Sequence, residues 1–168
     1  SALSPEDLRA VFSFDEAYQR HERGEIEAAA YFEHLRRHLK LTASDEQIEA
    51  GWNAIFLGEI AATRALVQRA RRRLPCHAFS NTNATHMRQW TAQCPEVVSA
   101  LDGLFVSHEI GLRKPERAAF EHVAHALGVD PGGIVFFDDL QDNVQAAREA
   151  GLQAVWVRGP QDVAAALE

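Results

Sequence analysis

Two adjacent carboxylates, Asp138 and Asp139, directly follow the apolar residues 134–137. An apolar run of this length is typical of a buried strand. Two carboxylates at its end are costly through desolvation and mutual repulsion unless a hard cation neutralises them, and Mg²⁺ is the cation that suits such oxygen ligands. A single aspartate here would be read as a helix cap. The adjacent pair favours a metal site over that alternative.

Lys114 is the candidate cationic side chain for the same site. It precedes Pro115, and a proline both begins a helix and holds the residue before it in an extended conformation. The ammonium group can then point into a site, offset the charge of a nucleophilic carboxylate and bind a phosphoryl oxygen. A solvated surface lysine is the alternative.

Ser80 and Asn81 follow another apolar run, residues 76–79. The Ser80 hydroxyl and nearby backbone amides can donate hydrogen bonds to a phosphate during transfer. A local turn in which the hydroxyl bonds its own backbone is the alternative.

Short apolar runs and helical segments alternate from residue 59 onward, which indicates a parallel sheet. Ligands bind outside the carboxyl ends of the strands in open sheets of this kind, so we expect Ser80, Lys114 and Asp139 to converge at one edge. The expected helices cover residues 59–73, 116–127 and 143–150, and the expected strands cover residues 76–79, 103–106, 133–137 and 154–157.

Residues 1–58 contain apolar side chains at helical spacing only. Ser4 and Ser44 are each placed to cap a helix, since acidic residues follow both of them. We therefore predict a helical domain over residues 1–58 and an α/β core over residues 59–168.

These features together resemble the haloacid dehalogenase superfamily, in which a strand-ending Ser or Thr, a later lysine and a still later acidic pair follow an N-terminal nucleophilic aspartate. The resemblance covers nearly the whole chain. It is nearest to the bacterial α-D-glucose-1-phosphate phosphatases and the phosphatase domain of soluble epoxide hydrolases, partly through residues 21–26. It implies a Rossmann-like parallel sheet with a small helical cap, in which residues 21–23 either face the substrate or form a solvated turn.

The resemblance also implies roles for the candidate site residues. Asp138 would support Mg²⁺ through water or through Lys114, and Ser80 and Lys114 would assist the transfer itself. The implied site consists of Asp139 and Asp138 for the metal, Ser80, Asn81 and Lys114 for the phosphate, and Asn143 as a brace for the metal loop.

Family members begin with an apolar strand ending in Asp-x-Asp, whose first aspartate attacks phosphorus, and no such strand is apparent in this sequence. Asp7 and Asp15 lie in helical surroundings and are not assigned as nucleophile. By resemblance the missing strand is central, between the Ser80 strand and the Asp138 strand. Its loss would leave two buried ladder edges, which is costly for a domain of ordinary stability. We therefore expect a segment lost by truncation or proteolysis, or another polypeptide, to fill that position.

The expected function is a magnesium-dependent phosphatase for a small phosphorylated metabolite such as a sugar phosphate, acting through an aspartyl-phosphate. The acidic pair favours phosphate over halide, because a halide leaving group needs no cation bridging phosphate oxygens. A catalytically inactive fragment that binds a ligand or partner is one alternative. A receiver-type signalling domain is another, although receivers place their acidic pair first in the chain and here it comes last.

Composition restricts the partners. The formal net charge of −7 disfavours nucleic acid and anionic lipid. No apolar run approaches the roughly 20 residues that a membrane span needs, and the first residues lack the features of a signal peptide. Cys76 and Cys94 are expected to be reduced thiols, and the pair His34 and His38 has no third metal ligand nearby. We expect a cytoplasmic protein with a small phosphate ester as its partner, and the oligomeric state stays open.

Overall fold

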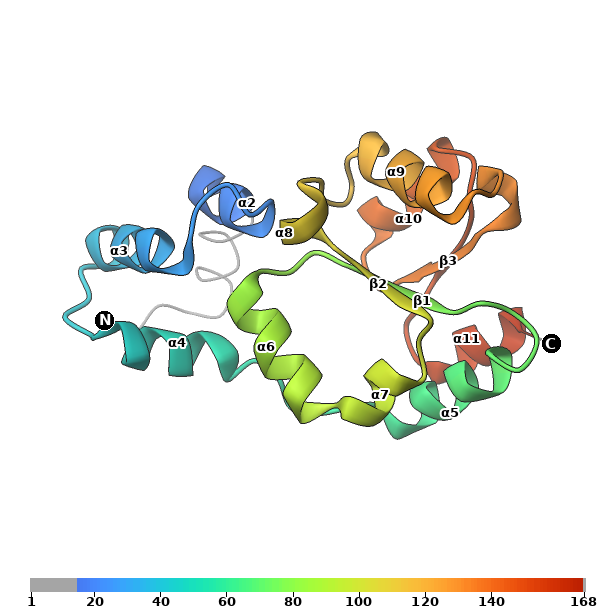
Figure 1. Cartoon of the computed structure of the whole chain (residues 1–168), viewed down its shortest axis with the longest axis horizontal. Coiled ribbons are helices and arrows are strands. Elements are labelled where there is room, and N and C mark those ends of the chain that lie inside the picture. Colours follow the sequence, from blue (N-terminus) through green and yellow to red (C-terminus); the bar gives the residue numbers. More distant parts are fainter. Residues whose placement is uncertain (1–14, 168) are drawn as a thin grey trace.

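The structure is a computed structural model of the chain, and it describes residues 15–167 (Figure 1). Asp7 and the helix expected to begin at Ser4 lie outside the described residues. The described part is α/β, with parallel strands between helices and a helical lobe at one end, as expected.

Three helices form the helical lobe: α2 (Glu16–Glu22), α3 (Ala28–Leu39) and α4 (Asp45–Asn53). Ser44 begins α4 as expected, because its hydroxyl accepts from the Gln47 amide at 3.3 Å and its own amide donates to the Gln47 side chain at 2.9 Å. The lobe has its own core, whose buried members are Tyr31, Phe32, Leu35 and Ile48. The helical spacing of the first three places them on one face of α3.

The remaining elements alternate between helices and short strands, as the sequence predicts. They are α5 (Ala61–Ala70), β1 (His77–Ser80), α6 (Ala84–Gln93), α7 (Pro95–Ser99), β2 (Gly103–Val106), α8 (Ser107–Ile110), α9 (Arg117–Leu127), the 3₁₀ turn η1 (Pro131–Gly133), β3 (Val135–Asp138), α10 (Gln141–Glu149), β4 (Gln153–Trp156) and α11 (Pro160–Ala166).

Helix α10 begins two residues earlier than predicted, at Gln141 instead of Asn143. The Asp138 carboxylate accepts from the Leu140 amide at 2.9 Å, and this turn starts the helix directly after the strand. Helices α6 and α7 were not predicted from the sequence.

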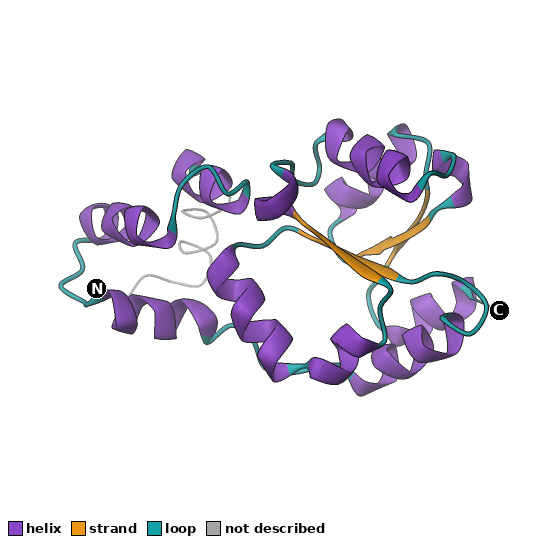
Figure 2. Ribbon diagram, in the orientation of Figure 1, coloured by secondary structure: helices purple, strands orange, loops and turns teal. Residues whose placement is uncertain are grey.

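The strands form two separate parallel pairs, β1 with β2 and β3 with β4 (Figure 2). Within residues 15–167 no ladder joins β1 to β3. Side chains bridge them instead, since the Phe79 ring of β1 lies 6.0 Å from that of Phe136 in β3, and Phe120 of α9 packs edge-on against both. The break falls between the Ser80 strand and the Asp138 strand.

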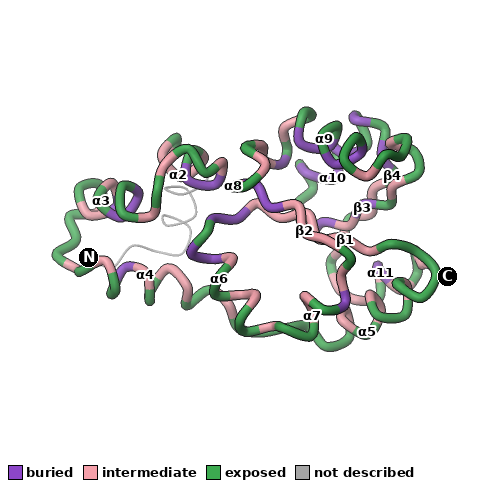
Figure 3. The backbone as a smooth tube through the Cα atoms, in the orientation of Figure 1, coloured by how far each residue is buried: buried purple, intermediate pink, exposed green. Residues whose placement is uncertain are grey.

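Helices cover both faces of the strands. Helices α9 and α10 lie on one side, and α5 and α11 pack together on the other (Figure 1). Buried backbone gathers along α9 and α10 and where β1 and β2 lead toward the helical lobe (Figure 3). The main core consists of Phe120, Phe136, Ala147, Ala150 and Leu152. This core fixes the ends of β1 and β3, which carry the predicted site residues.

Candidate active site

The Lys114 ammonium group lies between the two strand pairs. It donates to Asp138 Oδ2 at 2.7 Å and to the Phe79 carbonyl of β1 at 2.8 Å. Its nitrogen is also 5.0 Å from the ring centre of Phe79 and 5.3 Å from that of Phe136. Both members of the ion pair are buried, and a buried ammonium in such apolar surroundings is stable only with a charged partner. Lys114 is therefore a buried, charge-paired lysine and not a surface lysine.

The Asp138 carboxylate is fully engaged within the protein. Its Oδ2 accepts from Lys114, and its Oδ1 accepts from the Leu140 amide at 2.9 Å and from Asn143 Nδ2 at 3.0 Å. Asn143 thus contacts the acidic loop through Asp138. These three bonds hold the Asp138 carboxylate in one orientation at the end of β3.

Asp139, the next residue, is exposed. Its carbonyl accepts from Trp156 Nε1 at 3.0 Å, but its carboxylate makes no hydrogen bond or ion pair with any residue that the structure describes. A free carboxylate beside a buried one fits one side of a Mg²⁺ site. Residues 15–167 hold no cluster of three or more His, Cys, Asp or Glu side chains that could bind a metal ion, so such a site needs further ligands.

Asn81 has a different environment from the one expected. Its carboxamide pairs with the backbone of Lys114, accepting from the Lys114 amide at 2.8 Å and donating to the Lys114 carbonyl at 2.7 Å. Both halves of the amide are therefore committed to holding the Lys114 loop against the end of β1. The Nδ2 group carries a second N–H that neither bond uses, so these contacts do not prevent Asn81 from donating to a phosphate.

Ser80 ends β1 and is partly buried, and its hydroxyl makes one long hydrogen bond of 3.4 Å to the Asn81 carbonyl. That bond is weak, so the hydroxyl can turn toward another acceptor. Thr82, two residues after Ser80, is tied to the first residue of α8, since the Ser107 hydroxyl accepts from the Thr82 amide and donates to the Thr82 carbonyl, both at 2.9 Å. The contact between Thr82 and Ser107 was not predicted, because serine and threonine in a loop carry no signal of a partner 25 residues away.

Residues 21–23 are engaged with other parts of the protein and do not form a solvated turn. His21 and Glu22 are buried, and Glu22 and Arg23 form ion pairs with Arg113 and Glu116, on either side of Lys114 and Pro115. The end of α2 therefore contacts the loop that carries Lys114.

Asp15 has a structural role at the start of α2. Its carboxylate accepts from the Ala17 amide at 2.9 Å and from His34 Nε2 at 2.8 Å. These contacts place it in the helical lobe, which agrees with leaving it out of the nucleophile candidates.

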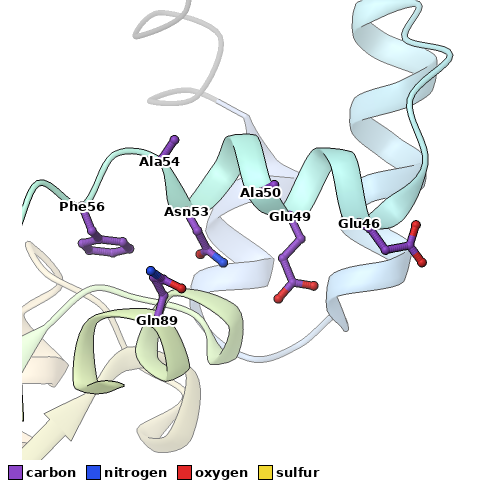
Figure 4. Close-up of a pocket in the computed structure, with 7 residues that line it drawn as sticks. All are labelled: Glu46, Glu49, Ala50, Asn53, Ala54, Phe56 and Gln89. Carbon is purple, nitrogen blue, oxygen red and sulfur yellow. The ribbon is translucent and has the colours of Figure 1, made fainter. Parts of the chain in front are cut away.

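An open depression of about 510 Å³ lies between α4 and α6, away from these residues (Figure 4). Asn53 and Gln89 meet across it, and Glu46 and Glu49 make it acidic. It contains none of the predicted site residues, and its negative charge is unsuited to a phosphate ester. The candidate site is therefore the region around Lys114 and the strand ends, and not this depression.

No helix in the described part of the chain is long and apolar enough to cross a membrane.

Comparison with known proteins agrees with this geometry. Residues 5–151 match the model of a hydrolase family, the haloacid dehalogenase-like hydrolases. The chain is 34% identical over 125 residues to phosphatase MT3486 of Mycobacterium tuberculosis (strain CDC 1551 / Oshkosh), covering 73% of this chain and 58% of that protein. It is also 35% identical over 72 residues to the bifunctional epoxide hydrolase 2 of Rattus norvegicus, covering 43% of this chain and 12% of that protein.

Among solved structures, a HAD family enzyme of Bacteroides thetaiotaomicron in complex with magnesium and inorganic phosphate is similar, with a TM-score of 0.81 and 25% identity. The match covers 91% of this chain and 80% of that one. The family model spans most of the chain, and the structural likeness extends over both the helical lobe and the strands. The chain therefore belongs to the haloacid dehalogenase-like hydrolase family.

Proposed function

We propose that this chain is part of a magnesium-dependent phosphatase that hydrolyses phosphomonoesters of small metabolites such as sugar phosphates. The observation that carries the proposal is the buried Lys114 ammonium, which is fixed at the ends of β1 and β3 by the Phe79 carbonyl and by Asp138. A preorganised positive charge at the carboxyl ends of parallel strands is suited to an anionic substrate. The named activity of the Mycobacterium tuberculosis relative supports the same reaction class.

The described residues divide the work as follows. Lys114 provides the positive charge for phosphate and nucleophile, and Asp138 holds it in place. Ser80 supplies a hydroxyl donor whose present bond is weak. Asp139 offers the free carboxylate for Mg²⁺, which when bound neutralises charge between a nucleophilic carboxylate and the phosphoryl group. The similar Bacteroides enzyme was crystallised with magnesium and inorganic phosphate, which supports this assignment.

The proposal also includes a nucleophilic aspartate on a strand outside the described residues, between β1 and β3. Two features support this position. Neither β1 nor β3 forms a ladder with the other, and the Phe79 carbonyl of β1 bonds the Lys114 side chain instead of a neighbouring strand. An aspartate ending a parallel strand there would lie beside the Lys114 ammonium, where its ionised form is favoured for attack.

The division into a helical cap over residues 1–58 and a core over residues 59–168 is part of the same proposal. Two separate groups of buried side chains support it, one around Tyr31 in the helical lobe and one around Phe120 beside the strands. A cytoplasmic location is proposed as well, and the free thiols of Cys76 and Cys94 support a reducing environment.

The test is release of inorganic phosphate from a panel of sugar phosphates with Mg²⁺, using the protein together with any residues that its reading frame encodes upstream of Ser1. We expect turnover that Asp139→Asn abolishes. Asp130→Asn removes the same charge from an exposed loop residue and serves as the control. Absence of phosphate release across the panel, or identical rates for Asp139→Asn and the unchanged protein, would refute the assignment.

A catalytically inactive binding protein is the second candidate. It is favoured by the engagement of both Asp15 and Asp138 in structural contacts, which leaves neither as a free nucleophile. Binding of inorganic phosphate without any turnover of the panel would support this candidate over the first.

A further inference from the structure

The end of helix α2 is joined to the Lys114 loop by two ion pairs of opposite polarity. Glu22 Oε2 accepts from Nε and Nη2 of Arg113, at 2.8 and 2.7 Å. The next residue on the helix, Arg23, pairs through its guanidinium group with the Glu116 carboxylate. Arg113 immediately precedes Lys114, and Glu116 follows after one residue. Two neighbouring positions of the helical lobe therefore hold both ends of the short segment that contains Lys114.

The first of these pairs lies in a dry environment. The side chain of Glu22 is 5% exposed and that of Arg113 is 17% exposed, whereas the pair on the other side is more open. Tyr18 also bonds Glu22, and burial followed by the charge of Glu22 raises the pKa of the Tyr18 hydroxyl, which keeps it a donor. A buried carboxylate with two donors is stable only while both stay in place. Glu22 is thus tied to the position of Arg113.

Backbone contacts seat the same end of α2 against α8. Gly24 has a φ of +70°, and a Cβ at this position would overlap the His108 carbonyl oxygen. The turn that contains Gly24 is itself held by His21 Nδ1, which lies 3.0 Å from the Ile26 carbonyl. Only glycine permits both this backbone conformation and this close approach. The turn therefore lies directly on the segment that leads to Lys114.

The polarity of the two pairs specifies how α2 sits. Glu22 meets a cation and Arg23 meets an anion, so a displacement that brought Glu22 to Glu116 would place like charges together. Such an arrangement excludes the wrong seating as well as favouring the right one.

We propose that Glu22 and Arg23 are positioning residues, which latch the helical lobe onto the loop and thereby fix the Lys114 ammonium between the two strand pairs. The path is short: Glu22 holds Arg113, the backbone of Lys114 is held by Asn81, and the Lys114 side chain then reaches Asp138. The position of the helical lobe against the loop is in this way coupled to the position of the Lys114 ammonium group. The catalytic consequence rests on the proposed phosphatase function, whereas the effect on Lys114 itself does not.

The chain offers a direct measure of Lys114, because its sequence contains only two lysines, Lys40 and Lys114. Lys40 is exposed and Lys114 is buried, so limited acetylation followed by peptide mass spectrometry gives the reactivity of Lys114 relative to an internal standard. We expect Glu22→Gln and Arg113→Gln each to raise this ratio about tenfold, because loss of the latch frees the loop. The exchanged double variant Glu22→Arg/Arg113→Glu restores the ion pair and is expected to return the ratio to within about threefold of the unchanged protein.

Kinetics on the phosphate-releasing substrate supply the second measurement. The single variants are expected to lower kcat about tenfold with a smaller change in KM, and the exchanged double variant is expected to recover most of the loss. Arg20→Gln is the matched control, since it removes a charge from the same helix whose partner, Glu25, lies within the helical lobe. It is expected to leave both measurements unchanged.

Several outcomes would refute the proposed positioning role of Glu22 and Arg23. One is an unchanged acetylation ratio in folded single variants, and another is an exchanged variant no better than either single variant. Should the Glu22 variants fail to fold, Arg23→Gln and Glu116→Gln test the more exposed pair in the same way, and an unchanged ratio there would equally refute the proposal. If the protein without substitutions hydrolyses none of the substrates, only the phosphatase assignment is refuted. The positioning role of Glu22 and Arg23 is still tested, because the acetylation measurement needs no substrate.

Discussion

Lys114 and Asp138 form a buried ion pair of 2.7 Å that links the loop after α8 to the end of β3. The pair lies at the break between the two strand pairs, where Phe79 and Phe136 surround it with aromatic rings. This contact therefore links two parts of the core, the β1–β2 pair and the β3–β4 pair, that share no strand ladder.

Breaking this pair from either side is expected to be strongly destabilising. Lys114→Met or Asp138→Asn alone leaves one buried charged group without its partner, which costs about 3–5 kcal/mol of unfolding free energy. The double variant removes both charges and is expected to lose less than the sum of the two single losses. Urea denaturation of the four proteins gives the coupling energy. Additivity within about 0.5 kcal/mol would contradict the interpretation.

Asp139→Asn is expected to weaken Mg²⁺ binding without changing the free energy of unfolding. The side chain is exposed and makes no contact that would be lost, so the free energy of unfolding is expected to change by less than about 0.5 kcal/mol. Binding of Mg²⁺, measured by isothermal titration calorimetry, is expected to weaken at least about tenfold because a carboxylate ligand is removed. Asp130→Asn is the control, and equal Mg²⁺ affinities of the two variants would rule out Asp139 as a ligand.

Asn81→Ala is expected to loosen the Lys114 loop. The substitution removes both hydrogen bonds to the Lys114 backbone and leaves a partly buried amide and carbonyl unpaired, at a cost of about 1–3 kcal/mol. Gln145→Ala, which removes an exposed amide that bonds Glu149, is expected to cost less than about 0.5 kcal/mol. Thermal or urea denaturation compares them. Similar stabilities for the two variants would show that the Asn81 contacts are not needed to hold the loop.

His86 is expected to make the fold sensitive to acid. Burial lowers the pKa of His86 to about 4, while its Nε2 lies 3.0 Å from the Trp52 carbonyl. The unfolded chain therefore binds a proton between pH 6.5 and about 4 that the folded protein does not, so the contribution of His86 is fully present above pH 6.5 and is lost as the pH falls toward 4. The expected loss is about 3 kcal/mol by pH 4.

Urea denaturation at several pH values tests this titration. His86→Gln keeps a donor for the Trp52 carbonyl but does not titrate, so its stability should depend less on pH over that window than that of the unchanged protein. His122→Gln, at an exposed position of α9, should retain the original slope. Identical slopes for His86→Gln and the unchanged protein would contradict the prediction.

Much of the fold could be predicted because its signals are local. Apolar runs such as residues 134–137 indicated buried strands. Ser44 indicated the start of a helix, and it makes its capping contacts with Gln47, only three residues away. The early start of α10 could not be predicted, since it depends on the side-chain direction of Asp138. Helices α6 and α7 were not predicted from the sequence, and the start of α6 depends on Asn83, whose side chain accepts from the His86 amide.

The candidate site was predictable in its residue types and less so in its contacts. The family resemblance implied that Asp138 acts through water or through Lys114, and the structure shows a direct contact between Asp138 and Lys114. The commitment of Asn81 to the backbone of Lys114 was not expected, and neither was the pairing of Glu22 with Arg113. Each of these contacts depends on which groups the packed core leaves facing one another.

The amino-acid sequence by itself determined the α/β alternation, the helical lobe and the order of the strand-ending residues, because periodicity and capping act over a few neighbouring residues. Tertiary structure alone decided the partners of the buried polar groups, across 33 residues for Asn81 and Lys114 and 91 residues for Glu22 and Arg113. The physical reason is desolvation, since a charge or amide removed from water must find a partner among whatever groups the fold brings close.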